Sequence, residues 1–224
     1  MDGMSGKVPF CVEKAHETQL QLSKHIVSAD RLPKKIRLIA GVDVAYAKGI
    51  SIGAVAVLDY SSLKLIESQI VHCKTGFPYI PTLLSFREIR PTVLSIMKLK
   101  AQPDIFIVDG QGLAHPYRCG FASHLGLVIN KPTIGVAKSR LFGEVEKMKT
   151  GDNLAFLKHQ GEVVGAMIKA KSGRKPVYVS IGHLISLETA IKIVRHCAKD
   201  HYLPEPILKA HSAATAEKRK INIA

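Results

Sequence analysis

Three extended runs separated by very short connectors constrain the fold of this chain more than any other feature. They cover residues 36–46 (IRLIAGVDVAY), 50–60 (ISIGAVAVLDY) and 63–75 (LKLIESQIVHCKT). The first two are rich in apolar and β-branched residues, and the third alternates apolar with polar residues, as strands do. Neighbouring strands joined by so few residues pair antiparallel, so the sequence predicts a three-stranded antiparallel meander.

A helix and a buried strand are predicted next. Residues 83–100 have helical spacing, and Pro91 should kink this helix or open a second one, because proline lacks a backbone donor. Residues 105–110 (IFIVDG) form a continuous apolar run that is typical of a parallel strand. A right-handed crossover would place this strand beside the first one. The order is similar to that of the ribonuclease H-like fold, an α/β fold with a mixed sheet flanked by helices.

The rest of the chain alternates predicted helices and strands without a composition break. We therefore expect a single domain over residues 1–224. Helices are expected within the first 35 residues and at 119–129, 187–202 and 206–220, and strands at 132–137, 161–170 and 176–182.

Three carboxylates stand out, two of them in apolar strands where charge is costly. Asp43 interrupts the first apolar run, Asp109 ends the buried strand, and Glu88 lies on the helix between them. If the strands pair as expected, the three converge, and a divalent cation would relieve their repulsion. Oxygen ligands favour Mg²⁺, with Mn²⁺ as a substitute, and such a centre suits phosphodiester hydrolysis.

Each carboxylate also has a simpler interpretation. Asp43 could pair with a lysine or a backbone donor, Asp109 and Gly110 could form an ordinary turn, and Glu88 could face solvent beside a Lys or Arg. The combination of the three in this strand order favours the metal site.

The charge balance points to a polyanionic partner. The chain has 32 Lys and Arg residues against 18 Asp and Glu, a formal net charge of +14. Such an excess attracts nucleic acid, although an ordinary basic protein remains the alternative.

Cysteine usage and the lack of a signal peptide or an apolar segment long enough to span a membrane suggest a cytoplasmic protein. The four cysteines are dispersed, which favours reduced thiols over a zinc site or a disulfide framework. We expect no signal peptide and no membrane span, because neither pattern occurs. A monomer is expected, since no exposed apolar stripe is apparent.

Long ordered motifs then indicate a family. The segments FPYIP, LLSFRE, VDGQGLAHP, GFASHLGL and PTIGVAKSRLFG resemble endonuclease V, the deoxyinosine-directed DNA repair nuclease, over nearly the whole chain. The resemblance implies a ribonuclease H-like fold and Mg²⁺ dependence. It also implies a nick at the second phosphodiester bond 3′ of hypoxanthine, leaving 3′-hydroxyl and 5′-phosphate ends.

Residue roles follow from the resemblance. It assigns Asp43, Glu88 and Asp109 to the metal, His211 to the water or phosphate, and Lys138 to the scissile phosphate. Tyr79 resembles the wedge that fills the space of the displaced base. The base pocket would include Leu84, Gly110, Gly112, His115, Phe121 and Leu141.

Simpler roles are open for these residues as well. Tyr79 could pack on Phe77, Lys138 could be an ordinary phosphate-facing charge, and His211 could be a surface histidine. The chain also departs from some relatives, with Thr82 where they have glycine.

The substrate and the activity have alternatives too. The sugar preference is open, so inosine in RNA is a second substrate beside deaminated DNA. A third hypothesis is a module that recognises altered nucleic acid without cutting it. The presence of all three carboxylates argues against this hypothesis.

Overall fold

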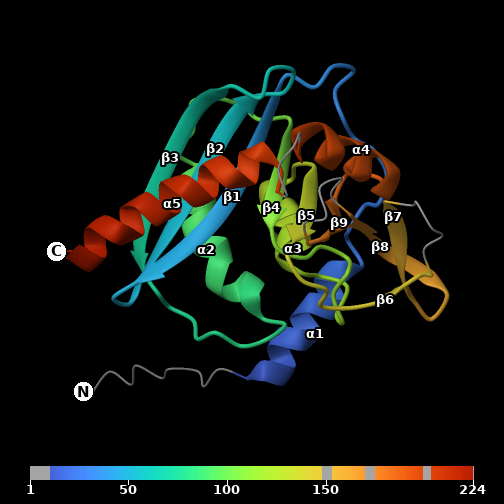
Figure 1. Ribbon diagram of the computed structural model, residues 1–224. Helices are drawn as coiled ribbons and strands as arrows, with labels where there is room; N and C mark the ends of the chain where they lie inside the picture. The colour runs from blue at the N-terminus through green and yellow to red at the C-terminus, as the bar shows by residue number, and fades with distance from the viewer. Residues whose placement is uncertain (1–10, 148–152, 170–174, 199–202, 224) are drawn as a thin grey trace.

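The computed structural model describes residues 11–147, 153–169, 175–198 and 203–223 (Figure 1). Within them, nine strands form one mixed sheet in the order β3-β2-β1-β4-β5-β9-β8-β7-β6. The strands are β1 (Leu38–Ala47), β2 (Ile50–Asp59), β3 (Leu65–Lys74), β4 (Ile105–Asp109), β5 (Thr133–Ala137), β6 (Glu144–Val145), β7 (Leu154–His159), β8 (Glu162–Ile168) and β9 (Val177–His183).

The predicted meander is confirmed. Strand β1 pairs antiparallel with β2 along its whole length, from Leu38 opposite Asp59 to Ala47 opposite Ile50, and β2 pairs antiparallel with β3. Strand β4 lies parallel to β1, as the crossover predicted, and β5 lies parallel to β4. The predicted ribonuclease H-like mixed sheet is therefore correct, and β9 then returns antiparallel to β5.

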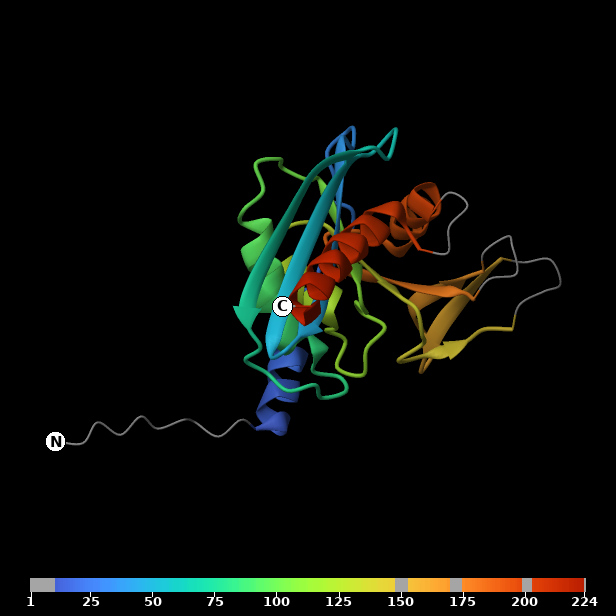
Figure 2. The ribbon, with the colours of Figure 1, turned by 60° about the vertical axis from the view of Figure 1, so that its left-hand side comes forward.

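Helices cover both faces of the sheet (Figures 1 and 2). The helices are α1 (Val12–Ser23), α2 (Leu84–Ile96), α3 (Phe121–Ile129), α4 (Leu187–Ala198) and α5 (Glu205–Ile223). Helices α4 and α5 pack on one face, where Ile107 of β4 meets Ile193 and Ile207. Helices α2 and α3 pack on the other, where Val42 and Val108 meet a second apolar cluster. The alternation of side chains along a strand assigns neighbouring residues to opposite faces.

The expected helix at the N-terminus is shorter than predicted. Helix α1 ends at Ser23, and the segment that follows is irregular. Leu32 and Ile36 nevertheless pack against the core, so their apolar character reflects burial of a loop rather than a helix. Residues 1–10 of that prediction, and 199–202 of the predicted helix 187–202, lie outside the described residues.

The predicted opening of a second helix at Pro91 is wrong, because α2 runs continuously through that residue. Pro91 packs against β2 at Gly53, where a Cβ would lie 2.2 Å from the Pro91 carbonyl oxygen. We infer that close packing at this contact offsets the cost of the backbone hydrogen bond that proline cannot donate. Strands β6 and β7 were not anticipated at all.

No helix in the described part of the chain is long and apolar enough to span a membrane.

Candidate active site

The register of the parallel strands brings two carboxylates side by side. Val42 of β1 and Val108 of β4 are paired, and Asp43 and Asp109 are the next residues on the two strands. Neighbouring strands lie about 4.8 Å apart, and residues at the same level point to the same face. Since Val42 and Val108 point toward α2 and α3, the two aspartates point toward the face that α5 covers.

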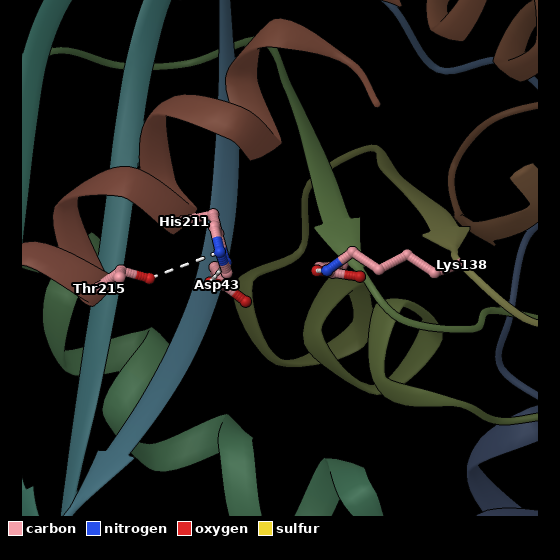
Figure 3. Close-up of polar contacts among 5 residues, drawn as sticks. Asp43, Lys138, His211 and Thr215 are labelled. Carbon is pink, nitrogen blue, oxygen red and sulfur yellow. Dashed lines mark hydrogen bonds and ion pairs between the residues drawn. The ribbon is translucent and has the colours of Figure 1, made fainter. Parts of the chain in front are cut away.

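Each aspartate is held by a basic side chain from a different element (Figure 3). His211 of α5 lies with its Nδ1 2.8 Å from Oδ2 of Asp43. Lys138, which follows the end of β5, donates from Nζ to Oδ2 of Asp109 at 2.5 Å. On the other side of the imidazole, Thr215 Oγ1 lies 3.5 Å from Nε2 of His211. The two aspartates are thus partly buried anions with adjacent cationic or polar partners.

The third carboxylate is buried. Glu88 is 7% exposed, so it does not face solvent, and Tyr46 donates its hydroxyl to Glu88 Oε1 at 3.1 Å. The pKa of Glu88 is raised to about 8, chiefly by burial and also by the charges of Asp43 and Asp109, while the Tyr46 hydrogen bond and the Arg87 charge oppose the rise. Glu88 approaches from α2, on the opposite face from the aspartate side chains, yet it lies within their electrostatic range.

The pKa of Asp109 is also raised. Burial is the largest cause, the Asp43 charge adds to it, and the Lys138 ammonium opposes both. Three carboxyl groups whose charged forms disfavour one another are a suitable donor set for a divalent cation.

The side chains are not arranged around a metal as they stand. In the part of the chain that the structure describes, no three His, Cys, Asp or Glu side chains are grouped so that they could hold one. Instead, Asp43, Asp109 and Glu88 are engaged by His211, Lys138 and Tyr46. The chemistry of the donors fits a hard cation, which would replace Lys138 and His211 as the partner of the carboxylates.

A cavity of about 320 Å³ opens directly beside Asp109 and Lys138. This volume lies in the range of small-molecule pockets, roughly 300–1,000 Å³. Its lining is Tyr79, Ile80, Pro81, Thr82, Leu84, Ser85, Asp109, Gly110, Gln111, His115, Gly120, Phe121, Ala137, Lys138, Ser139 and Leu141. The structure therefore brings all but one of the predicted pocket residues together around a single cavity.

The exception is Gly112, which does not line the cavity. Its backbone N–H donates to Ser180 Oγ at 2.8 Å, and a Cβ would lie 2.0 Å from the carbonyl oxygen of Ile181. The close packing against β9 leaves no room for a side chain at this position, which explains the glycine.

Tyr79 stands at the mouth of the cavity with 69% of its surface exposed. It is not loop core, because Phe77 stacks on Phe86 instead. An exposed aromatic ring beside a cavity is a suitable surface for stacking on a nucleobase.

Helix α1 and His115 hold the loop that carries Tyr79. Gln19, fully buried, donates from Nε2 to the carbonyl oxygens of Thr82 and Cys119, and so joins two walls of the cavity. His16 lies 2.9 Å from Thr82 Oγ1. Thr82 has φ 72°, a conformation that favours glycine, so these contacts stabilise a strained residue. Nothing in the sequence singled out His16 or Gln19, which are far from Thr82 along the chain.

The protonation of His115 follows from its surroundings. Burial lowers the pKa of His115 to about 4, so the ring is neutral near pH 7. Its Nδ1 accepts from the backbone N–H of Tyr117, so the proton is on Nε2, which donates to the Thr82 carbonyl at 3.0 Å.

We expect Gln19→Leu to lower the free energy of unfolding by about 1–3 kcal/mol, because it removes the side-chain donor of the buried Cys119 carbonyl and one of the two donors of the Thr82 carbonyl. Urea unfolding measures the change. Gln21→Leu is the control, since Gln21 is on the same helix but exposed. Equal stabilities of the two variants would contradict the role of Gln19.

Comparison with known proteins identifies relatives that match most of the chain. The family model for endonuclease V matches residues 20–212. An endonuclease V from Thermofilum pendens is 44% identical over 94% of this chain and 90% of its own. The crystal structure of endonuclease V from Streptomyces avermitilis superposes with a TM-score of 0.86 at 31% identity, covering 96% of each chain. That of Ciona intestinalis endonuclease V, in complex with DNA containing an inosine followed by a ribo-adenosine, has a TM-score of 0.86 at 33% identity, covering 94% of this chain and 98% of that one.

Proposed function

This chain belongs to the endonuclease V family of nucleases, and we propose that it is a Mg²⁺-dependent DNA repair endonuclease acting at deoxyinosine. It would nick the strand at the second phosphodiester bond 3′ of the hypoxanthine base, leaving 3′-hydroxyl and 5′-phosphate ends. The observation that carries the proposal is the position of Asp109 and Lys138, which lie beside the partner carboxylate Asp43 and also line the cavity.

The cavity supports recognition of an extruded base. Hypoxanthine paired inside a duplex hides the edge that distinguishes it from guanine, so an enzyme must flip it out to read it. We assign the base to the space between Leu84, Gly110, His115, Phe121 and Leu141, which line the cavity. Gly112 packs against β9 and is not part of this lining. Tyr79 would stack in the space that the base leaves in the duplex.

The charged residues support the hydrolysis. Asp43, Glu88 and Asp109 would hold Mg²⁺, or Mn²⁺ as a substitute, and the bound cation supplies electrostatic stabilisation of charge on the phosphate. Lys138, already beside Asp109, would move to a phosphate oxygen when the carboxylate is engaged by the cation. His211 is 52% exposed on its side chain and contacts Asp43, so it can orient a water or a phosphate oxygen there.

A nicking assay on a labelled duplex with one deoxyinosine tests the function. We expect one cut, one nucleotide beyond the lesion on its 3′ side, in Mg²⁺ or Mn²⁺ and none with a chelator. An otherwise identical deoxyguanosine duplex, which should stay intact, is the control. Cutting in the chelator would overturn the metal dependence, and an intact deoxyinosine duplex would overturn the activity.

Inosine-containing RNA is a second candidate substrate. It is favoured by the Ciona intestinalis relative, whose bound DNA has a ribo-adenosine after the inosine. Three strands of one sequence separate the candidates: all DNA, DNA with a single ribonucleotide after the inosine, and all RNA. Faster cutting of RNA than of DNA would reassign the substrate without changing the site.

We extend the proposal to a single-domain monomer that works in the cytoplasm. One continuous sheet runs through the described residues, and all four cysteines are free thiols.

A further inference from the structure

A second cavity, of about 480 Å³, lies on the α5 side of the carboxylates. It extends from the end of β1 along the last turns of α5. Its lining is Asp43, Val44, Ala45, Tyr46, Lys138, His211, Thr215, Lys218, Arg219 and Asn222. We call this cavity the α5 groove. Its outer wall lies beyond residue 212, where the match to the family model ends.

The outer wall of the groove is cationic. Lys218 and Arg219 are exposed, and neither makes an ion pair among the described residues. The acidic residue beside them, Glu217, is directed elsewhere, because it contacts His72 at 3.4 Å and Lys220 at 2.9 Å. The outer half of the groove therefore has uncompensated positive charge, and this charge is exposed and can attract an anion.

The α5 groove and the base cavity meet at the reactive centre. Lys138 lines both of them, Asp43 lines the α5 groove, and Asp109 lines the base cavity. A strand that has its flipped base in the base cavity and a phosphate at the carboxylates would continue into the α5 groove.

We propose that the α5 groove binds the sugar–phosphate backbone on the 3′ side of the cut, through Lys218 and Arg219, with Asn222 and Thr215 as further donors. The direction rests on the proposed function, in which the base is in the first cavity and the cut is 3′ of that base. Contacts of this kind hold the strand in place without reading its sequence. The groove would thus hold the product strand that carries the 5′-phosphate.

The salt dependence of binding tests the proposal. Affinity for the deoxyinosine duplex is measured by fluorescence anisotropy in chelator, where the strand stays intact, over a range of salt concentrations. Each phosphate contact contributes about 0.9 to the slope of log K against log salt on duplex DNA. We expect the double variant Lys218→Ala with Arg219→Ala to lose about 1–2 from that slope. We expect Lys220→Ala, on the same helix but paired with Glu217 and outside the groove, to keep it.

The direction of the strand is tested with the length of the DNA. Shortening the duplex on the 3′ side of the cut should weaken binding by the wild type more than by the double variant, whereas shortening it on the 5′ side should affect both equally. The proposal is overturned if the double variant has the slope of Lys220→Ala, or if the difference between proteins follows the 5′ arm. Failure of the proposed function is a separate result, since wild type would then leave deoxyinosine DNA uncut whatever the slopes. Thermal unfolding verifies that the variants, all at exposed positions, are folded.

Discussion

Asp43→Asn is expected to lower the rate of cleavage of a deoxyinosine duplex by at least about 10³-fold, while affinity changes by only a few-fold. The substitution keeps the shape of the side chain and an oxygen for His211, 2.8 Å away, but removes one negative charge from the proposed cation site. A cation contributes several kcal/mol of charge stabilisation, and about 4 kcal/mol corresponds to 10³ in rate. Single-turnover cleavage and anisotropy in chelator measure the two effects separately.

Glu188→Gln is the control for this variant. Glu188 is an exposed carboxylate on α4 that forms an ion pair with Lys192, and its loss should leave cleavage unchanged. Full cleavage by Asp43→Asn would show that the carboxylates were assigned wrongly. Loss of both binding and cleavage would show that Asp43 helps to form the DNA-binding surface. A wild type that binds deoxyinosine DNA without cutting it would favour the recognition module instead.

Gly41→Ala is expected to lower the free energy of unfolding by about 3 kcal/mol and to reduce cleavage as well. A Cβ on Gly41 would lie 2.1 Å from the backbone carbon and oxygen of Pro206, so α5 would have to move away from β1. Overpacking of this kind costs about 1–3 kcal/mol, and more where backbone rather than a side chain must shift. Because His211 is on α5, the movement would also separate it from Asp43.

Urea unfolding and the nicking assay test this pair of effects. Gly76→Ala is the matched control, since Gly76 has no atoms within 4 Å of an added Cβ and needs no positive φ. We expect its stability to change by less than about 0.5 kcal/mol. If Gly41→Ala were as stable as Gly76→Ala, the close contact between α5 and β1 would not be required for the fold.

Local patterns were sufficient for the elements nearest the site. The apolar runs with short connectors predicted β1, β2 and β3 as a meander, and a continuous apolar run predicted β4 as a buried parallel strand. Patterns failed where the chain interacts with distant residues. Helix α2 continues through Pro91 and packs closely on Gly53, and the apolar residues after α1 are partly buried in a loop.

The same division applies to the site. Asp43 and Asp109 were conspicuous in sequence, because charge is costly in apolar strands, and the family resemblance named their companions. Their placement required the register of β1 against β4, which periodicity leaves open. No sequence pattern indicated a role for Gln19 or His16, because their hydrogen bonds to Thr82 join residues that are far apart in the chain.

The sequence by itself therefore determined the mixed sheet and the family, and it singled out the three acidic residues as candidates, because these depend on residue chemistry and on contacts near in the chain. Only the tertiary structure decided which partner each carboxylate has, that Glu88 is buried, that Gly112 packs against β9 rather than lining the cavity, and that α5 carries a cationic groove past the reactive centre. These features arise where segments distant in the chain meet, from 29 residues apart for Lys138 and Asp109 to 168 for His211 and Asp43, and such contacts are set by the packing of whole elements.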